Sequence, residues 1–271
     1  MVTADVVIGG FRMDATDDIL IQCSGQVMRI TLNRPQRRNA LTVPMMDAIR
    51  LAVETADQQD CRVIVLTGAG DRAFCAGADL TSDDTPFKPD FAQLSLPFAN
   101  LLRALRGSDL PIMCVVNGAC VAGGMGFLGI CDVAIASSTA KFGMPEAKVG
   151  IFPMQIVAVL QGLIPERDMR ELCVTGRIID ADEASRIRLV NRVVEPEQLG
   201  AEADIWIDRM IATSPMAIRR GKYAMRAMRD MSFEQMIAFA ETMVGPMILT
   251  EDAREGMAAF AQKRSPNWPN A

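Results

Sequence analysis

Two glycine-containing turns, each preceded by an apolar run, offer backbone groups that could do chemistry. One lies in VIVLTGAGDRAFCAGAD (residues 63–79), the other in IMCVVNGACVAGGMGFLGICD (residues 112–132). Glycine lets the backbone approach a ligand closely. A helix that starts after such a turn presents oriented N–H donors and the positive end of its dipole. Two such donors aimed at one point form an oxyanion hole, which stabilises the enolate of a thioester.

A glutamate in an apolar setting could supply acid–base chemistry. Glu146 lies in KFGMPEAKVGIFPM (residues 141–154). Pro145 biases Met144 toward an extended backbone, so we expect the carboxylate to follow the end of a strand. Apolar surroundings raise the pKa of a carboxyl group, which suits proton transfer near neutral pH. The alternative is an ordinary capping or surface glutamate near the start of a helix.

The chain contains no histidine. This excludes Ser-His-Asp and Cys-His mechanisms and the usual imidazole metal sites, and we predict that no metal is bound. Acid–base chemistry is left to carboxylates, lysine, cysteine or the one tyrosine, Tyr223. The cysteines are odd in number and lack CxxC spacing, which favours reduced, buried thiols in a cytoplasmic protein. They are Cys23, Cys61, Cys75, Cys114, Cys120, Cys131 and Cys173.

Composition limits the class of protein. With 271 residues, half of them hydrophobic, the chain can bury one large core. A net charge of −5 argues against general nucleic-acid binding. No apolar run approaches the ~20 residues that span a bilayer. The N-terminal residues 1–18 lack a basic region and an apolar core, so we expect a polar extension rather than a signal peptide.

Strand and helix signals alternate in the first two thirds of the chain. The order of strand, turn and helix indicates stacked β-β-α units with a largely parallel sheet. We expect a hairpin over residues 19–33 with a turn at Ser24-Gly25-Gln26, a helix opened by Thr42 or Pro44, strands at 63–67, 112–116 and 133–137, a mobile polar loop at 81–91 and a helix at 92–106.

From about residue 165 the pattern becomes helical. Start signals stand at Asp180, at Ser214-Pro215, at Ser232 with Gln235 three residues later, and at Thr250. Many methionines fall on these helices, which favours core or subunit packing.

Four segments in this order resemble the crotonase (enoyl-CoA hydratase/isomerase) superfamily. They are LNRPQRRNAL (32–41), FCAGADL (74–80), the NG…GG…CD run (117–132) and FGMPE (142–146). The resemblance runs from about residue 19 to the end of the chain. It implies an α/β fold, with a crotonase-like ββα spiral core over residues 19–197 and a C-terminal helical trimerisation region over 198–271. It also implies a homotrimer or a dimer of trimers.

The resemblance implies an acyl-CoA thioester substrate, with coenzyme A carried by the substrate and no separate cofactor. The enolate would be held by the N–H groups of Ala78 and Gly123, and Glu146 would act as base and acid. Arg37 and Arg38 would supply positive charge for the CoA phosphates, although a solvated charged turn is their ordinary reading. The other residues implied to contact substrate or CoA are Ala40, Ala76, Asp79, Leu80, Gly124, Pro145 and, often from a neighbouring subunit, Phe260 and Lys263.

One position departs from the hydratase pattern. Typical hydratases of this family carry a second glutamate three residues after the second oxyanion glycine, and here that position is Gly126. Hydration by the two-glutamate route lacks one carboxylate, whereas double-bond migration needs only Glu146, as in family isomerases. The bulky Met154 and Ile156, in place of a glycine-rich turn, would also make the acyl pocket drier. Alternatively, Gly126 makes room for a bulky acyl group, with Asp79 or Gln155 handling water.

The sequence therefore predicts an enoyl-CoA hydratase/isomerase-family enzyme of fatty-acid or acyl-CoA metabolism, isomerase-like in its single glutamate. Two alternatives stay open. One is a non-catalytic acyl-CoA-binding protein. The other is a different reaction of the same enolate, such as decarboxylation, C–C cleavage or thioester hydrolysis.

Overall fold

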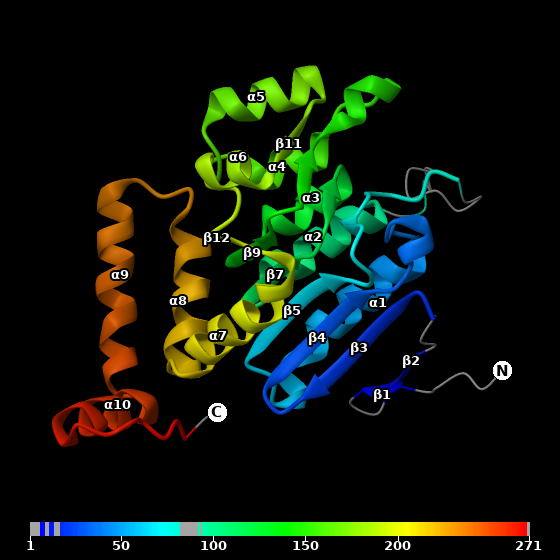
Figure 1. The fold of residues 1–271 in the computed structure, drawn as a ribbon. Coiled ribbons are helices and arrows are strands. Elements are labelled where there is room, and N and C mark those ends of the chain that lie inside the picture. The colour runs from blue at the N-terminus through cyan, green and yellow to red at the C-terminus, as the bar shows by residue number, and fades with distance from the viewer. Residues whose placement is uncertain (1–5, 9–10, 14–16, 82–91, 93, 270–271) are drawn as a thin grey trace.

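Two β-sheets share the strands of successive β-β-α units (Figure 1). The six-stranded sheet has the order β12-β9-β7-β5-β4-β3, and all its neighbours are parallel except the β3–β4 hairpin. Its strands are β3 (Ile19–Ser24), β4 (Val27–Leu32), β5 (Val63–Gly68), β7 (Ile112–Val116), β9 (Val133–Ser137) and β12 (Arg192–Val194). The predicted hairpin, its turn and the largely parallel sheet are thus confirmed.

The four-stranded sheet has the order β11-β10-β8-β6. Its strands are β6 (Ala73–Cys75), β8 (Ala119–Val121), β10 (Lys141–Gly143) and β11 (Ile178–Asp180). The pairs β5/β6, β7/β8 and β9/β10 each place one strand in the large sheet and the next in the small one. A separate pair joins β1 (Val6–Ile8) and β2 (Phe11–Met13). This alternation is the predicted β-β-α repeat.

The computed structural model describes residues 6–8, 11–13, 17–81, 92 and 94–269. Most of the expected N-terminal extension, and the expected loop beyond Thr81, lie outside the described residues. The helices are α1 (Val43–Thr55), α2 (Pro97–Gly107), α3 (Gly123–Leu128), α4 (Met154–Leu160), α5 (Glu166–Thr175), α6 (Ala181–Arg186), α7 (Leu199–Ile211), α8 (Pro215–Met228), α9 (Phe233–Ile248) and α10 (Glu251–Gln262). In the described part of the chain, no helix has the length and apolarity needed to cross a bilayer.

Helix starts follow the predicted caps. The side chains of Thr42, Asp180, Ser214 and Thr250 each accept a hydrogen bond from the N–H three residues later. The Ser232 N–H donates to the Gln235 side chain at 2.8 Å, as a capping box requires. The helix expected at 92–106 instead begins at Pro97, because Leu96 before the proline is held extended (φ −70°, ψ 147°).

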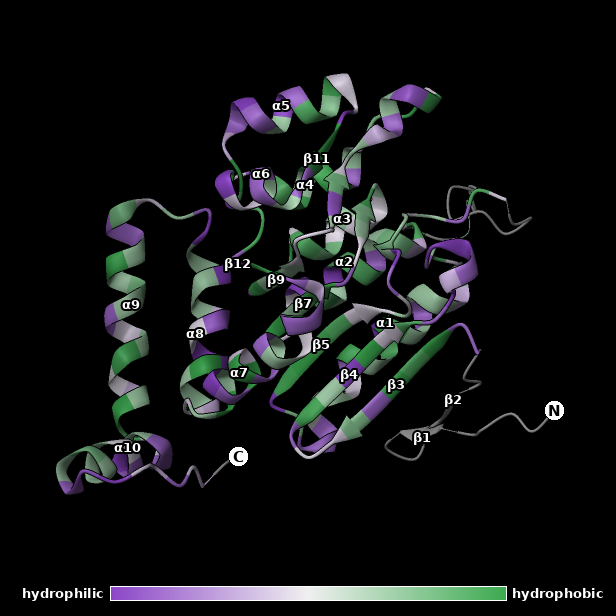
Figure 2. Ribbon diagram, in the orientation of Figure 1, coloured by the Kyte–Doolittle hydropathy of each residue, from purple (hydrophilic) through white to green (hydrophobic). Residues whose placement is uncertain are grey.

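The central strands β5, β7 and β9 of the large sheet are buried on both faces, which explains their continuous apolar runs. One face packs against the helices and the small sheet through residues such as Ile30, Ile64 and Leu66. On the other face, Val63, Val65, Met113 and Ile135 pack against α7. Figure 2 shows these central strands as hydrophobic ribbons.

The last three helices form an arm that extends from the sheets. In Figure 1, α8 and α9 lie side by side, and α10 crosses below them. None of the residues of α9 is buried, although its sequence is FEQMIAFAETMVGPMI. Its exposed apolar side chains include Phe233, Ile237, Val244 and Ile248. Figure 2 shows hydrophobic bands along this helix.

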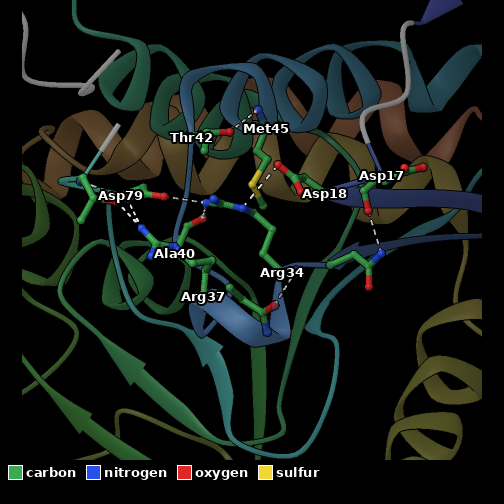
Figure 3. Close-up of polar contacts among 11 residues, drawn as sticks. Asp17, Asp18, Arg34, Arg37, Ala40, Thr42, Met45 and Asp79 are labelled. Atoms are coloured by element: carbon green, nitrogen blue, oxygen red, sulfur yellow. Dashed lines mark hydrogen bonds and ion pairs between the residues drawn. The ribbon is translucent and has the colours of Figure 1, made fainter. Parts of the chain in front are cut away.

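A buried carboxylate joins the loops that follow β4 and β6. Asp79, which is 5% exposed, accepts hydrogen bonds from Arg34 at 2.9 Å and Arg37 at 3.3 Å (Figure 3). The hydroxyl and N–H of Thr81 donate to the same carboxylate. Arg34 also donates to the carbonyl of Ala40 and pairs with Asp18 at the start of the hairpin. Chiefly the Thr81 hydroxyl, then the Thr81 N–H and Arg34, hold the pKa of Asp79 well below its usual range despite its burial.

We expect Asp79→Asn to lower the free energy of unfolding by about 2 kcal/mol at pH 7, because hydrogen bonds to a charged group are lost. The depressed pKa of Asp79 makes its contribution complete above the unfolded value, about 3.9, and smaller as the pH falls below it. Urea unfolding of both proteins between pH 7 and pH 3 measures this. A difference between the proteins that is independent of pH would contradict the assigned role of the Asp79 charge.

Candidate active site

An apolar cavity of about 530 Å³ lies beside the turn after β6, the start of α3 and the segment that follows β10. Among the described residues, Glu146 is the only carboxylate in its lining. The lining consists of Leu41, Met46, Ala76, Ala78, Leu80, Leu96, Phe98, Ala122, Gly123, Pro145, Glu146, Lys148, Val149, Ile151, Phe152, Pro153, Met154, Gln155 and Ile156. The two turns and the glutamate identified in the sequence thus meet in one cavity.

Two backbone turns approach each other closely on its wall. A Cβ atom at Gly77 would lie 2.8 Å from the Ala122 side chain and 3.0 Å from the Gly123 nitrogen, so only glycine fits. Gly77 also has φ +90°, which L side chains rarely adopt. A Cβ atom at Gly123 would lie 3.6 Å from the Ala78 nitrogen. The N–H groups of Ala78 and Gly123 are therefore neighbours.

Hydrogen bonds of the neighbouring backbone groups set the direction of the Ala78 N–H. The Leu41 N–H donates to the Gly77 carbonyl and the Asp79 N–H donates to the Leu41 carbonyl, each at 2.8 Å. Because successive groups of an extended segment alternate in direction, the Ala78 N–H points away from Leu41. Gly123 is the first residue of α3, where an N–H has no acceptor within the helix. The two donors can meet one oxyanion in the cavity.

The residue before the second donor is strained. Ala122 has φ +49° and ψ −125°, a conformation almost confined to glycine. Its N–H donates to the Gly143 carbonyl at 3.0 Å and its carbonyl accepts from Met125 at 2.9 Å. These bonds on either side hold the peptide that carries the Gly123 N–H.

Glu146 follows the end of the strand β10, as Pro145 before it predicted. It lies in a short 3-10 helix (Pro145–Val149). Its side chain is partly buried, and its Oε2 is buried without a hydrogen-bond partner among the described residues. Burial raises the pKa of this carboxyl above its usual value. The anion is thus poorly solvated, and a protonated form is accessible nearer to neutral pH.

The position of the expected second glutamate is filled by apolar side chains. A Cβ atom at Gly126 would lie 2.9 Å from Cζ of Phe98, 3.2 Å from Leu102 and 3.3 Å from Ile156. Phe98 and Ile156 also line the cavity, so the protein's own side chains lie beside Gly126. That Gly126 makes room for a bulky acyl group stays a prediction. A carboxylate at this point would be buried against hydrocarbon.

The other predicted substrate residues fall into two groups. Ala76, Leu80 and Pro145 line the cavity, as do Met154, Gln155 and Ile156. The residues that do not line it are Arg37, Arg38, Ala40, Asp79, Gly124, Phe260 and Lys263. Asp79 turns its carboxylate toward Arg34 and Arg37, so the suggestion that it handles water at the reacting atoms is not supported by its geometry.

Three of the residues outside the lining lie in other parts of the fold. A Cβ atom at Gly124 would lie 2.6 Å from the Cys75 carbonyl, so this glycine serves close packing on β6. Phe260 is 88% exposed on α10, and Lys263 ends that helix. Both belong to the arm that extends away from the sheets (Figure 1).

Sequence reasoning missed Arg34 and Lys148. Arg34 stands in the LNRP segment, and only its three-way contact with Asp18, Ala40 and Asp79 shows that it joins the loops. Lys148 is an exposed cation in the cavity lining, two residues after Glu146. Lys148 could have been found from the sequence, because it is a cation close to Glu146 in a segment of mostly apolar residues.

Comparison with known proteins agrees with this geometry. The family model described as enoyl-CoA hydratase/isomerase matches residues 22–271. The (E)-benzylidenesuccinyl-CoA hydratase of Thauera aromatica is 32% identical, over 93% of this chain and 99% of that protein. The short-chain-enoyl-CoA hydratase of Clostridium acetobutylicum is also 32% identical, over 92% and 96%. The crystal structure of an enoyl-CoA hydratase from Mycobacterium smegmatis superposes with a TM-score of 0.84 at 30% identity, covering 93% of this chain and 98% of that one. The chain belongs to the enoyl-CoA hydratase/isomerase family, the crotonase superfamily.

Proposed function

We propose that this enzyme moves a double bond in an enoyl-CoA thioester, from C3 to C2, with Glu146 as the single base and acid. The observation that carries the proposal is that the cavity lining holds one carboxylate, while apolar side chains surround Gly126, where a second would be expected. Two-base hydration needs a second group that positions water. In place of that group the described residues present Phe98, Leu102 and Ile156.

The mechanism uses one proton acceptor and two backbone donors. The Glu146 carboxylate removes a C2 proton, and the N–H groups of Ala78 and Gly123 stabilise the negative charge on the thioester oxygen. The same carboxyl group then returns the proton at C4. Its raised pKa suits both steps, because the base is strong enough to accept the proton and the acid strong enough to release it.

The CoA moiety would lie over the loop after β4. Arg37 and Arg38 are exposed there, and Lys148 is an exposed cation of the cavity lining. These positive charges would neutralise phosphate groups that an acidic chain otherwise repels. Coenzyme A would arrive with the substrate, so the reaction needs no separate cofactor. The buried thiols suit a reducing, cytoplasmic location.

The C-terminal arm would be covered by other copies of the chain, as a homotrimer or a dimer of trimers. The helix α9 carries apolar residues but has no buried position, so it presents an apolar patch to water. A patch of this kind typically marks a surface that another protein chain covers. Assembly would also bring Phe260 and Lys263 of one chain to the CoA end of another, since in their own chain they do not line the cavity.

We expect Glu146→Gln to reduce isomerisation of a 3-enoyl-CoA by about 10³-fold while CoA-ester binding survives, because the base is lost and the shape is kept. Its melting temperature at pH 8 should equal or exceed that of the wild type, since the raised pKa of Glu146 means that its ionised form costs stability. Absorbance assays, calorimetric binding and thermal melts measure the three quantities.

In the same assay, the double bond of a 2-enoyl-CoA should stay conjugated with its thioester carbonyl when the wild-type enzyme is added. Loss of conjugation that is catalysed by wild type and not by Glu146→Gln would show a hydratase. Binding of both esters without turnover would favour the non-catalytic acyl-CoA-binding alternative, and a product of different mass would identify another enolate reaction.

Gly126→Glu should not produce a hydratase. The new carboxylate would be buried against Phe98, Leu102 and Ile156, and we expect a loss of about 3 kcal/mol in the free energy of unfolding. Gly126→Ala, which adds only a methyl group, is the matched control and should lose less. Denaturant unfolding and the 2-enoyl-CoA assay test this, and a gain of hydration by Gly126→Glu would refute the proposed importance of the apolar cluster.

Val244→Glu on α9, where the native side chain is 54% exposed, should break the assembly and weaken binding of the CoA ester. Light scattering should give three or six chains for wild type and fewer for the variant. Glu241→Gln, at another exposed position of α9, is the control. A wild-type protein that is monomeric at micromolar concentration would contradict the assembly.

A further inference from the structure

Two thiols that are distant in sequence touch at the edge of the large sheet. The Sγ atoms of Cys23 and Cys61 are 3.7 Å apart, although 38 positions separate them in the chain. Cys23 is the next-to-last residue of β3, and Cys61 lies two residues before β5. The separation is about 1.7 Å longer than a disulfide bond, so a small rotation of side chains can close it.

The backbone around the two thiols is tied together. The N–H groups of Arg62 and Val63 both donate to the Gln26 carbonyl, at 2.7 and 3.3 Å, which fixes the hairpin turn to the segment that holds Cys61. Gln59 contacts both sulfurs, since its side-chain oxygen accepts from Cys23 and its carbonyl accepts from Cys61. The two thiols are therefore held facing each other.

The two thiols differ in access to solvent. Cys23 is exposed, whereas Cys61 is buried behind it. The initial expectation of buried thiols thus fails at Cys23, which lies at the exposed end of the edge strand β3, and Cys131 is only partly buried. Four other cysteines are buried, and burial raises the pKa of each of their thiols: Cys75, Cys114, Cys120 and Cys173. An exposed thiol next to a second thiol is the arrangement typical of reversible oxidation sites.

We propose that Cys23 and Cys61 form a redox modification site that a peroxide converts into an intramolecular disulfide. The Cys23 thiolate attacks one oxygen of hydrogen peroxide, giving a sulfenic acid at Cys23 and one molecule of water after protonation. The Cys61 sulfur then attacks the Cys23 sulfur, the S–O bond breaks, and a second water leaves. Two thiols lose two electrons in all, and one peroxide gains them. A dithiol reductant reverses the reaction by exchange.

The site is remote from the acyl cavity. In the β4–β5 register, Val27 pairs with Val63 at one end and Leu32 with Gly68 at the other. The thiols lie at the first end, and the loops that line the cavity follow the second. Figure 1 shows the β3–β4 turn at the lower end of the sheet, away from α3. Oxidation should therefore change stability more than catalysis, by restricting the unfolded chain.

The test uses the full chain, reduced and then treated with one equivalent of hydrogen peroxide, followed by alkylation of remaining thiols under denaturing conditions. Mass spectrometry of the wild type should show a loss of 2 Da and two fewer alkylated cysteines. Without reduction, trypsin should release residues 13–29 linked to residues 51–62. The melting temperature should rise by about 5 °C, and dithiothreitol should reverse all of these changes.

Two matched variants separate the roles of the thiols. Cys61→Ser should accumulate a sulfenic acid at Cys23 that dimedone traps, and Cys23→Ser should react at least tenfold more slowly than wild type. Both variants should keep the enoyl-CoA activity of the reduced wild type, which also shows that they fold. Seven alkylatable thiols after peroxide, a sulfinic acid at Cys23 without a cross-link, or a disulfide between two chains would each overturn the proposal.

Discussion

The closeness of two backbone turns is the constraint on which the rest of the site depends. Gly77 and the peptide before Gly123 approach within distances that exclude any side chain. That approach is possible because β6 and β8, which lead into the two turns, are parallel neighbours in the small sheet. The ββα stacking therefore has a chemical outcome: it places two N–H donors, from segments far apart in sequence, on one wall of a cavity.

The lining of the same cavity includes one carboxyl group, that of Glu146, in surroundings that solvate it poorly. The buried Oε2 of Glu146 gives up solvation that a surface carboxylate would keep. Asp79 is the contrast, because Arg34 and Thr81 hold its charge in place. The buried Asp79 and the partly buried Glu146 thus have pKa shifts of opposite sign, one that suits structure and one that suits proton transfer.

The sequence predicted the elements whose signals are local. Proline before Glu146, a cap at Thr42 and the apolar run of β5 each depend on residues next to one another, and the structure confirms them. Contacts across the fold could not be predicted from one sequence. That Phe98 fills the space at Gly126 depends on where α2 lies against α3, and no spacing in the chain encodes that distance. For the same reason, the contact between Cys23 and Cys61 was not foreseen.

The strained backbone of Ala122 gives the peptide between Ala122 and Gly123 a second possible orientation. Its φ of +49° is shared with the left-handed helical region, and only its ψ of −125° makes the conformation unfavourable for an alanine. Half a turn of the peptide that follows would bring ψ to about +55°, where L residues are accepted more readily. That same rotation would reverse the N–H of Gly123 and present a carbonyl oxygen to the cavity. The orientation of this peptide that directs the Gly123 N–H into the cavity is thus the one that the backbone angles of Ala122 disfavour. The hydrogen bonds of Ala122 with Gly143 and Met125 set the balance between the two orientations.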